Sequence, residues 1–289
     1  MTDESPSSAL LASPEYAIKT WRYLRLAMIA LVIALATAVI YEIARRGGDC
    51  VQTSISAYYY THAQAVFVGA LVAIGACLIS LRGSTDHEDV LLNLAGMLAP
   101  VVAFVPTPHA GDCASLEGVP QDPTPNIENN ITALLVVGLA AFAFLAGLAL
   151  WDRTHNATPR RPGTVALVGY GVAVALWAGG GVVFLAARGW FVGHAHIWAA
   201  VAMFTCIIAV AVVNAFSFKR KQGDPDARNR YLWIGVLMPV SVVALLVFGG
   251  KYDVLEAEAA AILLFAIFWA IQTQELWYEG LRPNQGLTP

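Results

Sequence analysis

The sequence predicts an all-α membrane protein, a bundle of about eight transmembrane helices with both termini in the cytoplasm. Of its 289 residues, 58% are hydrophobic and only 13% are charged, whereas charged residues make up about a quarter of a soluble domain. The apolar residues fall into eight runs, most of them close to the roughly 20 residues that cross a bilayer core. Backbone groups cannot stay unpaired in lipid, and no run alternates as barrel strands do, so the runs are expected to be helices.

The first span is expected at residues 26–44, directly after three basic residues. Residues 1–18 before it are rich in Ser, Pro and acidic residues, which predicts a mobile cytoplasmic tail. A cleaved signal peptide is the alternative, because Ala34-Leu35-Ala36 resembles a cleavage site. The long polar region with acidic residues ahead of the apolar stretch argues against cleavage.

Seven further spans follow, each bounded by Gly, Pro or charged residues. They are expected at residues 62–81, 90–106, 131–151, 164–187, 196–218, 231–249 and 257–276. Pro100 and Pro239 interrupt two of these spans, and proline can kink a membrane helix. We expect residues 19–279 to form a single transmembrane helical domain and residues 280–289 to form a cytoplasmic tail.

The Lys and Arg residues predict the orientation. With the N-terminus in the cytoplasm, 13 of the 17 Lys and Arg residues fall in inner segments. The outer segments then hold only Arg45, Arg46, Arg188 and Lys251. Because basic loops stay in the cytoplasm, this bias favours an arrangement with both ends inside.

Two of the four cysteines are disulfide candidates. The predicted topology places Cys50 and Cys113 in outer loops, in a compartment that permits disulfides, so we expect them to pair. Cys77 and Cys206 fall inside spans, where a buried apolar thiol is the expected role.

Polar residues concentrate where the predicted helices meet the outer side of the membrane. Every even-numbered helix has one in or just before its first turn, namely His62, Asn130, His196 and Glu258. Neighbouring outer segments add four further ligand-binding candidates, Glu42, Ser54, Ser56 and Tyr58. Because ionisable groups near a span are costly, this pattern predicts an outer-facing polar cavity. The alternative is that helix ends at an interface are naturally polar, with Asn130 and Glu258 serving only as caps.

Two further interpretations, a serine nucleophile and a histidine metal site, find less support in the sequence. Ser54 and Ser56 precede Tyr58-Tyr59-Tyr60, which favours an interfacial lip over a serine nucleophile, since no elbow motif is recognisable. His194 and His196 are spaced at i and i+2 and so do not share a helix face, and no metal site is predicted.

The functional prediction is binding or transport of a lipid headgroup or small polar ligand on the outer face. A net charge of −3 argues against nucleic acid as a partner. No cofactor motif is found, membrane lipids are the expected partners, and the oligomeric state is open. Two alternatives are kept: an intramembrane lipid-modifying enzyme using His62, His196, Glu258 and Ser54, and a structural or accessory membrane subunit.

Several motifs also carry a resemblance to a known group. They are Ser54-Ile55-Ser56-Ala57-Tyr58-Tyr59-Tyr60, Phe67-Val68-Gly69-Ala70, Ala103-Phe104-Val105-Pro106-Thr107 and the closing Phe268-Trp269-Ala270-Ile271-Gln272. The chain resembles uncharacterised bacterial multi-pass membrane proteins that look distantly related to the Frag1/DRAM/Sfk1 group. The resemblance covers mainly residues 50–107 and the last helix. It implies a bacterial inner membrane and a link to membrane-lipid handling or organisation, and it assigns no catalytic residues.

Overall fold

The computed structural model describes residues 14–48, 51–107, 121–155, 162–218, 225–248, 252–275 and 277. Within them lie eight α-helices, one 3-10 helix and no strand, which confirms the all-helical prediction for this part of the chain. The elements are α1 (Pro14–Arg45), η2 (Ser56–Tyr60), α2 (Gln64–Ser80), α3 (Asp86–Phe104), α4 (Thr124–His155), α5 (Thr164–Ala186), α6 (Arg188–Phe218), α7 (Pro225–Phe248) and α8 (Asp253–Glu275).

Six of these helices are long and apolar enough to cross a membrane, namely α1, α3, α4, α5, α6 and α8. The apolar helix α2 has only 17 residues. Large apolar side chains cover the outside of the bundle, including Ile33, Leu139 and Leu185, each more than half exposed. Such a surface suits a lipid environment, because a soluble protein rarely exposes so much contiguous apolar area.

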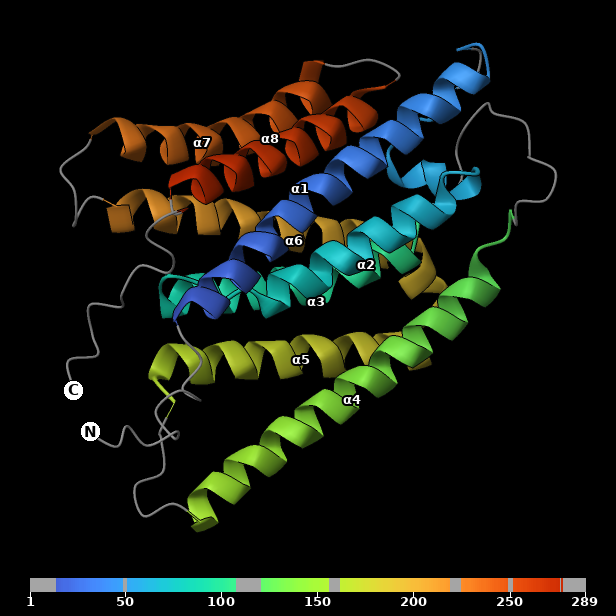
Figure 1. Ribbon diagram of the computed structural model, residues 1–289. Coiled ribbons are helices and arrows are strands. Elements are labelled where there is room, and N and C mark those ends of the chain that lie inside the picture. Colours follow the sequence, from blue (N-terminus) through green and yellow to red (C-terminus); the bar gives the residue numbers. More distant parts are fainter. Residues whose placement is uncertain are drawn as a thin grey trace, which may run out of the picture.

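Six helices form a closed ring in the order α1, α2, α3, α6, α7, α8, each packing on the next and α8 returning to α1 (Figure 1). The main core lies inside this ring and includes Met28, Phe67, Leu92 and Phe268. Helix α5 packs outside the ring on α3 and α6, and α4 diverges from the bundle beyond it (Figure 1). None of the most apolar 18-residue window of α4 is buried.

The start of α1 and the end of α8 lie together. Arg22 donates a hydrogen bond to the carbonyl oxygen of Trp277, and its guanidinium stands 4.7 Å from the centre of the Trp277 ring. The start of α1 and the end of α8 therefore lie on the same side of the bundle.

Several helices begin earlier than the apolar runs predict, because polar caps and first turns extend them. Helix α3 begins at Asp86, where the Thr85 side chain accepts a hydrogen bond from the Glu88 N–H, as an N-cap does. Helix α6 begins at Arg188 and α4 at Thr124. His196 and Asn130 consequently lie well inside their helices and not in the first turns.

Candidate functional site

The segment between α1 and α2, residues 51–63, is called the lip here. Its centre is η2, and Ser54, Ser56, Tyr58 and Tyr60 are all buried within the protein. The rings of Tyr59 and Tyr60 meet edge to face with centroids 5.6 Å apart. The lip predicted from the three tyrosines is thus a packed part of the bundle, at the end of the bundle where α1 and α3 end.

Hydroxyl groups fasten the lip to the end of α3. Ser56 Oγ lies 2.7 Å from Thr107 Oγ1, and Ser54 Oγ lies 3.2 Å from Ser56 Oγ and 3.3 Å from Thr107 Oγ1. The Tyr60 hydroxyl donates to the Thr107 carbonyl oxygen at 3.1 Å. Burial raises the pKa of Tyr60 to about 12, so the phenol keeps its proton for this bond.

The two serines lack the partner that a nucleophile requires. Ser54 Oγ accepts from the Ala57 N–H at 3.0 Å, and the other contacts of both serine hydroxyls are with Thr107 and each other. In the described part of the chain neither hydroxyl bonds to a His, Asp or Glu side chain, whereas an activated serine needs an adjacent base. The arrangement supports a structural role for Ser54 and Ser56.

Glu258 of α8 fastens the lip from the other side. One of its carboxylate oxygens accepts a hydrogen bond from the Ile55 N–H at 2.5 Å, and the Ser56 N–H also interacts with this carboxylate. Both bonds give backbone N–H groups of the lip an acceptor within the protein. Glu258 therefore joins α8 to the lip and does not cap its own helix.

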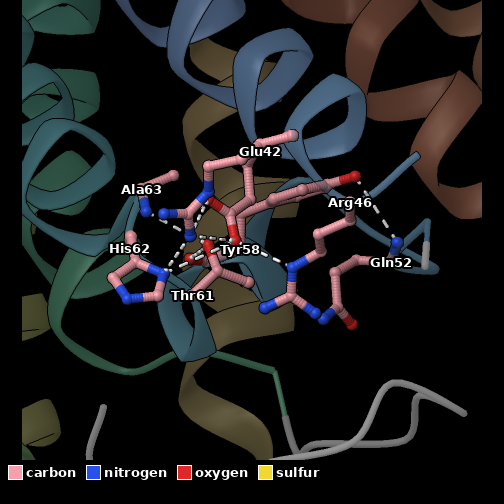
Figure 2. Close-up of polar contacts among 8 residues, drawn as sticks. Glu42, Arg46, Gln52, Tyr58, Thr61, His62 and Ala63 are labelled. Atoms are coloured by element: carbon pink, nitrogen blue, oxygen red, sulfur yellow. Dashed lines mark hydrogen bonds and ion pairs between the residues drawn. The ribbon is translucent and has the colours of Figure 1, made fainter. Parts of the chain in front are cut away.

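A charged cluster joins Glu42, Arg45 and Arg46 at the end of α1 to His62 of the lip. Figure 2 shows Glu42, Arg46 and His62 close together. Glu42 is only 3% exposed, and it accepts hydrogen bonds from Arg46 Nε at 2.9 Å and Arg45 Nη2 at 3.2 Å. His62 Nδ1 lies 2.6 Å from Arg45 Nη2 and 3.7 Å from Glu42 Oε1. The structure thus brings together Glu42 and His62, two of the ligand-binding candidates predicted from the sequence. Arg45 and Arg46 join them, although they were not among those candidates.

The outward side of this charged cluster is a set of hydrogen-bond donors. Arg45 makes its contacts with Glu42 and His62 through Nη2 alone, and its side chain is 44% exposed. Because a guanidinium can only donate, His62 Nδ1 accepts, and the neutral ring then carries its proton on Nε2. His62 is 48% exposed. One carboxylate and two guanidinium groups leave the cluster with a net positive charge, which suits an anionic ligand.

Tyr58 connects this charged cluster to the lip. Its hydroxyl oxygen accepts a hydrogen bond from the Gln52 N–H at 3.4 Å, and Figure 2 shows Gln52, Tyr58 and Arg46 in one neighbourhood. Burial raises the pKa of the Tyr58 phenol, so this group stays neutral. Tyr58 serves as packing and support for the arginines.

His196 and Asn130 lie apart from the charged cluster. His196 Nδ1 donates to the carbonyl oxygens of Val105 at 2.7 Å and Val102 at 3.1 Å. Val102 needs such a donor because Pro106, four residues later, has no N–H to offer it. Asn130 Oδ1 accepts from the neighbouring Asn129 at 3.4 Å. Among the described residues His196 makes no hydrogen bond to Glu42, His62 or Glu258. The four residues predicted to meet, His62, Asn130, His196 and Glu258, therefore do not form one hydrogen-bonded group.

The disulfide candidates Cys50 and Cys113 lie outside the described residues. Cys77 and Cys206 are free thiols in α2 and α6, and both are half-buried where full burial was expected. Across the residues that the structure describes, no group of three or more His, Cys, Asp or Glu side chains is placed to hold a metal ion.

A second group of buried polar residues, absent from the sequence prediction, occupies the opposite end of the ring. It contains Glu88 of α3, Asn214 of α6 and Gln272 of α8, each no more than 1% exposed. Two signals in the sequence point to it: the Thr85-x-x-Glu88 capping pattern, and the single polar residue Asn214 inside an apolar run. The acidic segment 86–89 thus contributes one fully buried carboxylate.

No protein-family model matches this chain, and comparison with curated proteins and with solved structures gives no match either.

Proposed function

We propose that this chain is a multi-pass membrane protein whose charged cluster binds the anionic headgroup of a membrane lipid. The observation that carries the proposal is the donor set of Arg45 and His62 around the buried Glu42 carboxylate. Within the described residues Arg45 keeps Nε and Nη1 available beside the His62 Nε2–H, and guanidinium donors match the geometry of phosphate oxygens. A link to membrane-lipid handling or organisation is also what the resemblance to the Frag1/DRAM/Sfk1 group implies.

The proposed topology has eight crossings with both ends in the cytoplasm, which places the charged cluster at the outer face. The 17 residues of α2 span about 26 Å, close to the roughly 30 Å of a hydrocarbon core. An even number of crossings agrees with the contact between Arg22 and Trp277, which joins the two ends of the helical region. The excess of Lys and Arg in the loops on that side supports its assignment to the cytoplasm.

This topology can be tested with reporter fusions in a bacterial host. An enzyme active only in the periplasm should be silent when fused after Pro289, and a reporter active only in the cytoplasm should be active there. The same pair fused after Asp122, just before α4, should give the reverse pattern. Periplasmic activity at Pro289 would contradict the topology.

The lipid site is tested by replacing Arg45 with glutamine. We expect Arg45→Gln to weaken binding of phosphatidylglycerol to the purified protein by about tenfold or more, because hydrogen bonds to charged groups contribute roughly 1.5–3 kcal/mol. Binding is measured by native mass spectrometry of the detergent-solubilised protein, with phosphatidylcholine as the zwitterionic comparison.

The matched control for this experiment is Arg188→Gln. Arg188 pairs with Glu128 at 2.8 Å and is 47% exposed, so this variant removes the same charge from a comparable ion pair elsewhere. Equal losses in both variants would point to a general charge effect and contradict the proposal. Competition by inorganic phosphate as strong as that by phosphatidylglycerol would identify a free anion as the ligand and overturn the assignment to a lipid.

A further inference from the structure

The buried polar group at the opposite end of the ring is named the amide–carboxylate cluster and comprises Ser84, Glu88, Asn214 and Gln272. Ser84 precedes α3, and the other three residues come from α3, α6 and α8, three helices of the ring. Glu88 lies in the first turn of α3, whereas the lip is fastened to Thr107 just beyond the end of that helix. This cluster is therefore separate from the site proposed above.

Nitrogen donors surround the Glu88 carboxylate. Its Oε1 accepts from Asn214 Nδ2 at 2.9 Å and from Gln272 Nε2 at 3.3 Å, and its Oε2 accepts from the Ser84 N–H at 2.7 Å. Gln272 Nε2 also donates to Asn214 Oδ1 at 2.9 Å. These bonds fix the position of the carboxylate and of both amide groups.

The same cluster leaves oxygen atoms without a partner. Gln272 Oε1 and Ser84 Oγ are buried and make no hydrogen bond in the described part of the chain. Among the described residues Glu88 Oε2 accepts only the Ser84 N–H, although each carboxylate oxygen offers about two acceptor positions. A buried acceptor without a donor is unfavourable by about 1–3 kcal/mol, so these oxygens favour the binding of a donor or a cation.

The charge of Glu88 requires such a partner as well. The residue is 1% exposed, and within the described residues no Lys, Arg or His forms an ion pair with it. A buried carboxylate without a counter-charge is strongly disfavoured. Oxygen ligands of the carboxylate, amide and hydroxyl types are those that hard cations select.

We propose that the amide–carboxylate cluster binds a monovalent cation of the Na⁺ type. Glu88 supplies the single negative charge that balances one positive charge, and Glu88 Oε2, Gln272 Oε1 and Ser84 Oγ supply oxygen ligands. The N–H bonds that hold Glu88 and the amides in place are retained when the cation binds. The side chains come from different elements of the ring, so the cation adds a link between α3 and α8 to the Gln272–Glu88 hydrogen bond.

The test compares melting temperatures of the purified protein in NaCl and in choline chloride at equal ionic strength and fixed pH. We expect Na⁺ to raise the melting temperature of the wild-type protein by roughly 3–5 °C when it exceeds its dissociation constant about tenfold. Glu88→Gln, which keeps the size of the side chain and removes its charge, should lose this shift.

Two further variants make the outcome decisive. Asp86→Asn removes one charge from an exposed side chain of the same helix turn and should keep the Na⁺ shift. Ser84→Ala removes one proposed ligand without touching the carboxylate, so the protein should fold and its apparent dissociation constant for Na⁺ should rise several-fold. A wild-type melting temperature that is equal in Na⁺, K⁺ and choline would overturn the proposal and leave Glu88 protonated or solvated by buried water. A shift that survives in both Glu88→Gln and Ser84→Ala would place the cation elsewhere and overturn it too.

Discussion

Replacing Gly96 with alanine is expected to force α2 away from α3 and to destabilise the protein. A Cβ atom on Gly96 would lie 2.6 Å from the carbonyl oxygen of Gly75, and one on Gly75 would lie 2.7 Å from that of Gly96. Both contacts are with backbone, so relief requires movement of a whole helix and not of a side chain. Small residues at this crossing let the helices approach closely, as is common in membrane proteins.

The expected size of this effect is about 1–3 kcal/mol in the free energy of unfolding, as for other overpacked sites. It can be measured by unfolding the purified protein in mixed micelles with increasing sodium dodecyl sulfate. Gly69→Ala in α2 is the matched control, because a Cβ there meets no atom within 4 Å. Since alanine favours a helix over glycine by roughly 0.5–1 kcal/mol, the control variant should become slightly more stable. Two shifts of the same sign and size would contradict the packing account.

Apolar runs were sufficient to predict which segments form helices. A run such as 164–187 corresponds closely to α5, because Gly163 and the polar residues around it end the apolar pattern. Helix starts were predicted less well, because first turns are polar: Thr85 caps α3 ahead of its apolar residues, and α4 begins at Thr124 with a polar turn. The closed ring of six helices joins segments far apart in sequence, such as α1 and α8, and no single-sequence pattern reports such contacts.

The candidate site was predicted in part for a similar reason. Glu42 and His62 stand at the two ends of one short connection, so their contact follows from chain proximity. His196 instead donates a hydrogen bond to the Val102 carbonyl oxygen of α3, which receives no N–H from Pro106. Nothing in the sequence of α6 indicates this contact. Glu88, Asn214 and Gln272 meet only when three helices pack. In sequence Glu88 belongs to the acidic segment 86–89, Asn214 stands alone in an apolar run, and Gln272 begins the polar end of the last helix.

Removing the Glu258 carboxylate is expected to release the lip. Glu258→Ala leaves the buried Ile55 N–H without its acceptor, and a buried donor left unsatisfied costs about 1–3 kcal/mol. The Ile55 amide should exchange with solvent much faster, which hydrogen–deuterium exchange with mass spectrometry of peptides covering residues 51–61 can detect. Glu256→Ala is the matched control, because Glu256 is an exposed carboxylate in the same helix.

Glu258→Gln separates the hydrogen bond from the charge. Its amide oxygen can still accept from Ile55, so exchange in the lip should increase far less than in Glu258→Ala. His62 ends the lip next to Arg45, so a released lip should also weaken phosphatidylglycerol binding in Glu258→Ala while Glu256→Ala binds as the wild type does. Unchanged exchange at residues 51–61 in Glu258→Ala would show that the hydroxyl bonds to Thr107 hold the lip alone. Loss of lipid binding without faster exchange would instead indicate that Glu258 acts on the charged cluster through its charge, and not through the position of the lip.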